Sequence, residues 1–234
     1  MIKRILRDLL RKKPQKFLDK KNNLLVATAF ISANDIIGDY YEFGVFKGKS
    51  FITASKLYQK HIKRLAKNGT SEFGKQRMHY FAFDSFEGLP VKGVDQSDIP
   101  QHWKGSGVMS YPEAEFLGNL KSGGVPVSQV TTVKGFYNES LKPELIKDLN
   151  MRPASIIHID CDLYESTRDV FGFITPLIQD GTVLIFDDYF YYRGHPNKGE
   201  RGAFNQWLKE NPHFISTELC KFYPSASFII NIQE

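Results

Sequence analysis

The stretches that decide the fold are IIHIDCDLYEST (156–167) and GTVLIFDDYF (181–190), in each of which an apolar run stops at acidic residues. The apolar parts, Ala154 to Ile159 and Thr182 to Phe186, are short and rich in β-branched residues. Strands that are buried on both faces of a sheet have this composition. The two stretches therefore predict two neighbouring buried strands.

A crossover helix is expected between them, over Leu163 to Gln179, with Asp180-Gly181 closing it. Such βαβ units are almost always right-handed, so both strands are parallel and their carboxyl ends open on the same side of the sheet. Asp160, Asp187 and Asp188 then face one crevice. Three carboxylates so close together favour a hard divalent cation such as Mg²⁺. For any one of these acids alone, a cap on the following helix is the competing interpretation.

Composition indicates one soluble, cytoplasmic domain. The chain has 234 residues, 41% of them hydrophobic, and no apolar run reaches the length of a membrane span. The charged N-terminus is unlike a secretory signal. Cys161 and Cys220 lack the spacing of a zinc site and are expected to be buried thiols.

The formal net charge of +5 comes from the N-terminus, where residues 3–21 hold nine Lys or Arg and two Asp. Because the excess of positive charge lies in the N-terminus and the rest of the chain is slightly acidic, we expect no nucleic-acid substrate. Residues 1–38 are predicted to form a helical segment that acts as a lid or an interface, ahead of a domain over 39–234. Its first helix is basic and amphipathic, so contact with an anionic membrane is an alternative to packing on the domain or on a partner subunit.

The remaining segments alternate strand and helix, as in a doubly wound, mostly parallel Rossmann-like α/β sheet. Further strands are expected over 39–43, 79–83 and 127–133, and a hairpin of 216–223 with 227–232 should form an antiparallel edge at the C-terminus. Irregular stretches near 91–116 and 189–202 are expected to be cap loops over the site. Trp103 and the aromatic tract 189–192 within them could stack on a ligand or simply pack beneath the loops.

A glycine turn follows the first strand in YYEFGVFKGKS (40–50), where Gly44 and Gly48 precede a helix. Such a turn lets a ligand approach the backbone and the helix N-terminus. It lacks the three glycines of a dinucleotide site and the Lys-Ser/Thr of a P-loop, which disfavours NAD and ATP. The second strand ends at Asp84 in FAFDSFEGLP (81–90), where an acid can accept hydrogen bonds from ribose hydroxyls. An Asx turn with Ser85 and Gly88 is the alternative for Asp84.

Five motifs, in this order, resemble the macrocin O-methyltransferase (TylF-type) family: EFGVFKGKS, FDSFEGLP, GFYNESL, HIDCDLYEST and GTVLIFDDY. The resemblance implies a Rossmann-like fold, S-adenosylmethionine and Mg²⁺ as cofactors, and methylation of a hydroxyl of a sugar or another vicinal diol. It leaves a homodimer open. The cofactor contacts that it implies are Glu42, Phe43, Gly44, Val45, Gly48, Ser50, Asp84, Ser85, Gly135, Phe136 and Asp160.

The same resemblance assigns the metal to Asp160, Asp187 and Asp188. Asp162 is expected to point away from Asp160 if the strand continues through it, and so to lie behind the metal ligands. Asp160 and His195 are the candidate catalytic residues, with His195 as the base that takes the hydroxyl proton; a surface histidine without a role is the competing interpretation.

Two other functions remain open at this point. A glycosyltransferase also places a D-x-D motif after an apolar strand, where it binds a metal and a nucleotide sugar. A binding protein of the same fold without catalysis is the second alternative.

Overall fold

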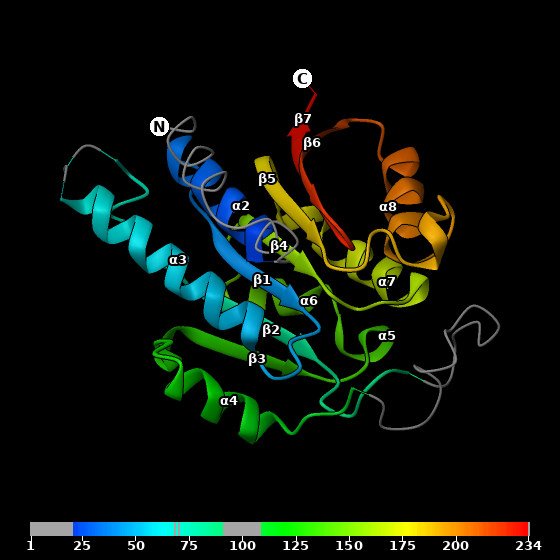
Figure 1. Ribbon diagram of the computed structural model, residues 1–234, viewed down its shortest axis with the longest axis horizontal. Helices are drawn as coiled ribbons and strands as arrows, with labels where there is room; N and C mark the ends of the chain where they lie inside the picture. Colours follow the sequence, from blue (N-terminus) through cyan, green and yellow to red (C-terminus); the bar gives the residue numbers. More distant parts are fainter. Residues whose placement is uncertain (1–20, 68, 70, 91–108, 234) are drawn as a thin grey trace.

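A computed structural model describes residues 21–67, 69, 71–90 and 109–233 of the chain. They form a seven-stranded sheet in the order β3-β2-β1-β4-β5-β7-β6, with helices on both faces (Figure 1). The strands are β1 Asp39–Phe43, β2 Tyr80–Asp84, β3 Val130–Lys134, β4 Ala154–Ile159, β5 Ile178–Phe186, β6 Phe214–Phe222 and β7 Ser225–Ile232. The helices are α2 Lys21–Ala33, α3 Lys49–Ala66, α4 Glu113–Ser122, α5 Tyr137–Ser140, α6 Glu144–Asp148, α7 Tyr164–Ile174 and α8 Gly199–Glu210. Short 3₁₀ turns, η3 Val127–Gln129, η4 Thr175–Leu177 and η5 Tyr192–Gly194, complete the order.

The predicted fold class is confirmed. Strands β1 to β5 pair in parallel, and β7 is antiparallel to both β5 and β6. The third strand was predicted to begin at Val127, but η3 occupies its first residues, because the Gln129 N–H donates to the Pro126 carbonyl and closes a tight turn. The C-terminal hairpin is present, but its strands differ in bounds from the prediction, because β6 ends at Phe222 and β7 already begins at Ser225.

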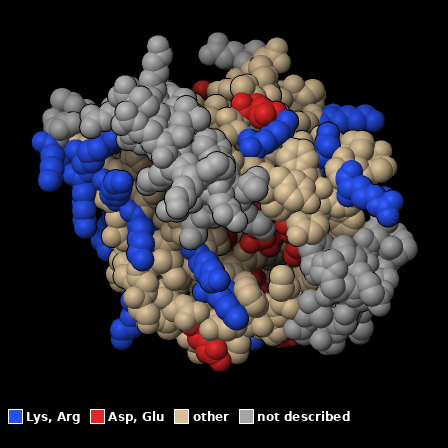
Figure 2. Space-filling view, in the orientation of Figure 1, with Lys and Arg blue, Asp and Glu red and all other residues tan. Residues whose placement is uncertain are grey.

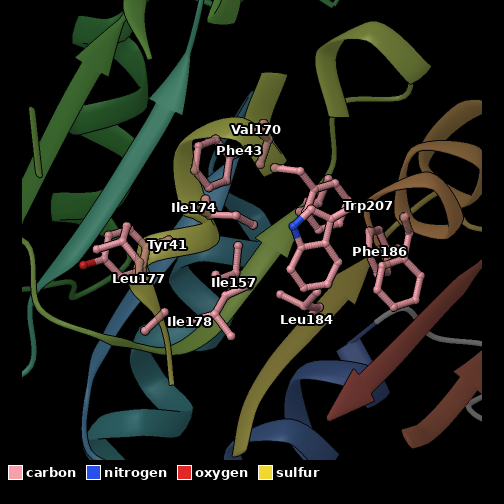
Figure 3. Packing of buried hydrophobic residues seen from close by; sticks show 14 of the residues in the cluster. Tyr41, Phe43, Ile157, Val170, Ile174, Leu177, Ile178, Leu184, Phe186 and Trp207 are labelled. Carbon is pink, nitrogen blue, oxygen red and sulfur yellow. The ribbon is translucent and has the colours of Figure 1, made fainter. Parts of the chain in front are cut away.

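Alternate residues of the strands pack into two cores, one on each face of the sheet. On one face, Tyr41 and Phe43 of β1 pack with residues of α7 and α8, and Figure 3 shows Trp207 of α8 within this cluster. On the other face, Tyr40 packs with residues of α2, α3 and α4. Because both faces are covered, the described part of the sheet meets solvent chiefly at its edges and strand ends, and a ligand can approach the strand ends.

The crossover between β4 and β5 differs from its prediction. Helix α7 ends at Ile174, and Pro176 in η4 prevents its continuation. Strand β5 already begins at Ile178, so Asp180-Gly181 lies within the strand and does not close the helix. There the register shifts between Ala154 and Ile156, Gly181 adopts φ +85°, and Thr182 Oγ1 donates to the Ala154 carbonyl at 2.8 Å. The Asp-Gly pair therefore marks a β-bulge.

Helix α2 contributes Leu24, Ala27 and Ile31 to the core that it shares with β1 and α3. It therefore packs on the same face of the sheet as α3, within the fold. The basic amphipathic helix predicted before Pro14 and the loop residue Trp103 lie outside the described residues. None of the helices in the described ranges is long and apolar enough to cross a membrane.

Candidate active site

A pocket of about 410 Å³ opens at the carboxyl ends of β1, β2, β4 and β5. Figure 2 shows acidic side chains inside a hollow near the middle of this face, and Lys and Arg side chains on the surrounding surface. Among the described lining residues Arg168 is the only Lys or Arg. The pocket is therefore strongly acidic within a basic protein.

The glycine turn after β1 forms one wall. Gly44 has φ +85°, and a Cβ atom added to it would lie 1.8 Å from the carbonyl oxygen of Asp160. Only glycine fits there, because β1 and β4 bring their ends into direct backbone contact. Gly48, with φ +76°, caps the N-terminus of α3. The predicted close-approach turn is therefore present.

Asp84 ties this turn to the end of β2. Its Oδ2 accepts hydrogen bonds from the backbone N–H groups of Val45 and Phe46 at 2.8 and 3.1 Å. Its Oδ1 accepts from the Phe86 N–H at 2.8 Å, and Ser85 Oγ donates to the Gly88 carbonyl at 2.7 Å. The Asx turn considered above is thus present, and Asp84 also borders the pocket, where its oxygens retain capacity for a further donor.

Not all residues assigned to the cofactor border the pocket. Those that do are Gly44, Asp84, Ser85, Gly135, Phe136 and Asp160, whereas Glu42, Phe43, Val45, Gly48 and Ser50 are absent from its lining. The backbone N–H of Val45 donates to Asp84, and Gly48 lies in the turn that leads into α3.

Glu42 does not line the pocket and is completely buried. Its carboxylate accepts hydrogen bonds from Tyr40 Oη and Ser50 Oγ, and His158 Nδ1 lies 3.7 Å from Oε2. The burial of Tyr40, followed by the nearby Glu42 charge, raises the tyrosine pKa well above its usual value, so Tyr40 stays a donor. In this geometry Glu42 supports the glycine turn through Ser50.

The other half of the pocket is acidic. Ile159 and Phe186 are paired across β4 and β5, so Asp160 and Asp187 leave the sheet side by side. The Asp160 N–H donates to the Phe43 carbonyl and the Asp187 N–H to the Ile159 carbonyl, at 2.8 and 2.9 Å. Asp160, Asp162, Asp187 and Asp188 all border the pocket. The sequence correctly predicted that these strand ends converge.

Asp162 was predicted to point away from Asp160 only if the strand continued through it, and this condition is not met. The strand ends at Ile159, Asp162 adopts φ +60°, and the residue borders the pocket. There it is hydrogen-bonded to Asp188 and only 8% exposed. Burial, then this hydrogen bond and the charge of Asp188, raise the pKa of Asp162 well above the usual range of a carboxyl.

Sequence reasoning missed Glu200, in the first turn of α8. Its side chain is completely buried, Oε1 accepts from the Cys161 N–H at 3.1 Å, and Oε2 accepts from the Asp188 N–H at 2.9 Å. Burial, and secondly the Asp188 charge, raise the pKa of Glu200 well above its usual value. The residue lay in a predicted cap loop, 189–202, whose last four residues belong to α8. In the sequence, a single acid in such a loop cannot be distinguished from an acid exposed to solvent.

Within the described ranges, no three His, Cys, Asp or Glu side chains form a group that could hold a metal ion as they stand. The metal assignment to Asp160, Asp187 and Asp188 therefore stays a prediction. The thiol of Cys161, between two of the acids, is buried, and burial raises its pKa well above the usual value. It is a thiol rather than a reactive thiolate.

His195 lies outside the pocket. It is exposed, and its Nδ1 accepts a hydrogen bond from the Asn197 N–H at 3.2 Å. Its role as the base therefore stays a prediction. Of the aromatic tract, Tyr189 packs against Phe186, while Tyr191 borders the pocket. One ring of that tract can therefore meet a ligand.

The sheet order and the site at its carboxyl ends define a Rossmann-like fold of the kind found in O-methyltransferases. The O-methyltransferase NovP superposes with a TM-score of 0.69 at 19% identity, over 92% of this chain and 79% of NovP. The calicheamicin methyltransferase CalS11 superposes with a TM-score of 0.62 at 22% identity, over 97% of this chain and 90% of CalS11. These similarities establish the fold.

The chain belongs to the macrocin O-methyltransferase (TylF) family, whose model matches residues 18–201. One relative, 27% identical over 175 residues, is an 8-demethyl-8-(2,3-dimethoxy-alpha-L-rhamnosyl)-tetracenomycin-C 4'-O-methyltransferase of Streptomyces olivaceus. Another, 26% identical over 176 residues, is the demethyldecarbamoylnovobiocin O-methyltransferase of Streptomyces niveus. Each match covers 74% of this chain and 60% of the relative, so the chain spans less than two thirds of their length. Family membership argues against the glycosyltransferase alternative.

Proposed function

We propose that the protein is an S-adenosylmethionine-dependent and Mg²⁺-dependent O-methyltransferase that acts on a hydroxyl of a sugar or another vicinal diol. The observation that carries the proposal is that one pocket combines a wall of backbone groups with a wall of carboxylates. The glycine turn, Asp84 and Gly135 supply backbone groups and a ribose acceptor, and the acids after β4 and β5 line the same pocket.

The acceptor class is inferred from the relatives. Their names describe methylation of a rhamnosyl tetracenomycin and of a novobiocin precursor, and a solved relative is described as a TDP-rhamnose 3'-O-methyltransferase. A sugar ring with two adjacent hydroxyls suits an acidic pocket, because such hydroxyls are hydrogen-bond donors. Tyr191 at its border offers a face on which a sugar could stack.

The reaction is an in-line displacement. The acceptor oxygen forms a bond to the methyl carbon as the carbon–sulfur bond breaks, which gives a methyl ether, S-adenosylhomocysteine and a proton. Asp84 would orient the adenosine part from one side, and Asp160 would lie between the two reactants, since its carbonyl touches Gly44 and its side chain borders the pocket. Catalysis here depends on holding the two groups in line.

The acids suit a hard cation. Their ligand atoms are carboxylate oxygens, which Mg²⁺ prefers. Burial first, and the charge of Asp188 in addition, raise the pKa values of the neighbouring Asp162 and Glu200, so a bound cation would offset part of the cost of negative charge at this end of the pocket. Asp160, Asp187 and Asp188 would hold the ion. When bound, Mg²⁺ supplies Lewis-acid polarisation that lowers the pKa of the hydroxyl. Of the two predicted catalytic residues, Asp160 is the one that the pocket geometry supports.

The first test is calorimetric titration of S-adenosylhomocysteine, S-adenosylmethionine and a panel of nucleotide sugars, with Mg²⁺ and then with chelator. We expect saturable binding of both adenosyl ligands, and then methyl transfer to a diol acceptor. Heat from a nucleotide sugar alone would instead favour the glycosyltransferase. Adenosyl binding without methyl transfer to any acceptor would favour the binding protein.

A second test separates the two halves of the site. We expect Asp188→Asn to lower methyl transfer by about 100-fold, since one oxygen ligand of the ion is lost, and to change S-adenosylhomocysteine affinity by less than about threefold. The exposed Asp148→Asn on α6 is the matched control. Equal activity of the two variants would refute the metal assignment.

A further inference from the structure

Glu200 is the one completely buried carboxylate at the acidic end of the pocket that does not line it, among the described residues. It stands behind the pocket, on the first turn of α8. Figure 1 shows this helix beside α7, far along the chain from β4. What it contacts is therefore not dictated by neighbouring sequence.

Both oxygens of Glu200 accept backbone hydrogen bonds, and each bond goes to a different acidic turn. The Cys161 N–H belongs to the turn after β4, and the Asp188 N–H belongs to the turn after β5. Both hydrogen bonds are buried, so water cannot replace either of them if the side chain is lost. One side chain thus bridges the two turns that carry the pocket acids.

The approach of α8 is built for this contact. Gly199 adopts φ +55°, and a Cβ added to it would lie 2.5 Å from the ring of Tyr192 and 3.4 Å from the Asp162 carbonyl oxygen. A larger residue before Glu200 would push the helix away from the turn. A carboxylate in the first turn is also favoured by the positive end of the helix dipole.

We propose that Glu200 is a positioning residue, which sets the distance and orientation of the Asp160–Asp162 turn relative to Asp187 and Asp188 through two backbone N–H groups. This inference rests on the proposed function, because those acids are there to align the acceptor. Loss of Glu200 should therefore disturb the acidic half of the pocket and leave the half formed by Gly44 and Asp84 intact.

The variants are Glu200→Gln and Glu200→Ala, with Glu210→Gln as control. Glutamine has the shape of glutamate but presents an NH₂ group to one of the two N–H donors, so it keeps one bond and loses the other. Alanine loses both. Glu210 is exposed at the other end of the same helix, where its Oε1 accepts from Gln206, and it is remote from the pocket.

The kinetic readout is the split between kcat and cofactor binding. We expect kcat to fall by about 10-fold in Glu200→Gln and about 100-fold in Glu200→Ala, as misplaced catalytic groups do, with S-adenosylhomocysteine affinity within about threefold of the parent. The control should retain the parent kcat. Unchanged kcat in both Glu200 variants would overturn the proposal. So would an equal loss of kcat and cofactor affinity, which would indicate a general structural role.

Amide hydrogen exchange decides the matter even if the protein transfers no methyl group. In Glu200→Gln, exchange at the Cys161 or Asp188 amide should quicken at least tenfold, whereas the Asp160 and Asp187 amides, which have main-chain partners, should stay protected. Equal protection of all four amides would show that Glu200 does not hold the turns. Failure of the methyl-transfer assay in the parent protein, with this exchange pattern intact, would refute the function and leave the positioning role standing.

Discussion

The two halves of the pocket are built from different materials. At the ends of β1 and β2, the wall is mostly backbone: Gly44 and Gly48 have positive φ, and the Asp84 side chain is held by three backbone N–H groups. At the ends of β4 and β5, the wall is made of carboxylates, of which Asp162 and Asp188 are hydrogen-bonded to each other. The first half is therefore formed mainly by main-chain groups, and the second mainly by carboxylate side chains.

The two materials have different tolerances. A backbone wall is sensitive to added volume, because a new Cβ meets main-chain atoms that cannot rotate away. In a carboxylate wall, an isosteric substitution such as Asp to Asn keeps the shape of the pocket but removes a negative charge. Substitutions that add volume therefore test the backbone half, and substitutions that remove charge test the acidic half.

The largest effect is expected from Gly44→Ala. Its Cβ would lie 1.8 Å from the Asp160 carbonyl oxygen at φ +85°, so the ends of β1 and β4 must separate. We expect a loss of about 3 kcal/mol in the free energy of unfolding and no measurable S-adenosylhomocysteine binding. Denaturant unfolding and calorimetry measure the two quantities.

The control for this variant is Gly118→Ala in α4, where a Cβ meets nothing within 4 Å. It should be stabilising by about 0.5 to 1 kcal/mol through helix propensity. Retained cofactor binding in Gly44→Ala would mean that the close backbone contact does not shape the cofactor half.

A smaller effect, confined to the same half, is expected from Asp84→Asn. Asparagine has one acceptor oxygen, so it cannot serve both the Val45 and Phe46 amides on one side and the Phe86 amide on the other. S-adenosylhomocysteine affinity should fall about 10- to 100-fold in calorimetry, with the acidic half unaffected. Ser85→Ala, which removes the hydroxyl of the same turn, should cost less. An Asp84→Asn protein with the parent affinity would leave Asp84 as a turn residue only.

Much of this architecture is predictable from the sequence because its signals are local. The strand ends at Phe43, Asp84, Ile159 and Phe186, the antiparallel hairpin and the convergence of the acids follow from apolar runs and their stops. The glycine turn was also found, because Gly44 and Gly48 stand between a strand and a helix. Family motifs then gave these positions their expected roles.

What the sequence could not supply depends on geometry between distant segments. The bulge at Gly181 needs the partner strand to explain it, and the direction of Asp162 depends on where β4 ends, one residue before Asp160. Glu42 was assigned to the cofactor by motif but is enclosed by Tyr40, Ser50 and the nearby His158. Burial of a charged residue is a tertiary property.

The smallest effect is expected from Asp162→Asn, which tests how much the buried carboxylate of Asp162 destabilises the folded protein. The folded-state pKa of Asp162 is raised above the value of about 4 expected in the unfolded chain. Between the two pKa values the folded protein binds more protons than the unfolded one, so stability is greatest at low pH and falls as pH rises through the folded pKa. Asparagine removes this dependence.

In chelator, Asp162→Asn should therefore match the parent in thermal midpoint near pH 5 and exceed it by about 2 to 4 °C near pH 8, equivalent to about 1 kcal/mol for a chain of this size. Asp148→Asn, an exposed acid, should show the same difference from the parent at both pH values. Added Mg²⁺ should stabilise the parent at pH 8 and reduce the advantage of the variant, because a cation bound to the folded state offsets the repulsion. A parent that is more stable than Asp162→Asn at pH 8 in chelator would mean that the carboxylate cluster stabilises the fold without a cation. The two halves of the pocket would then differ in the groups that form them, but the acidic half would not destabilise the folded protein.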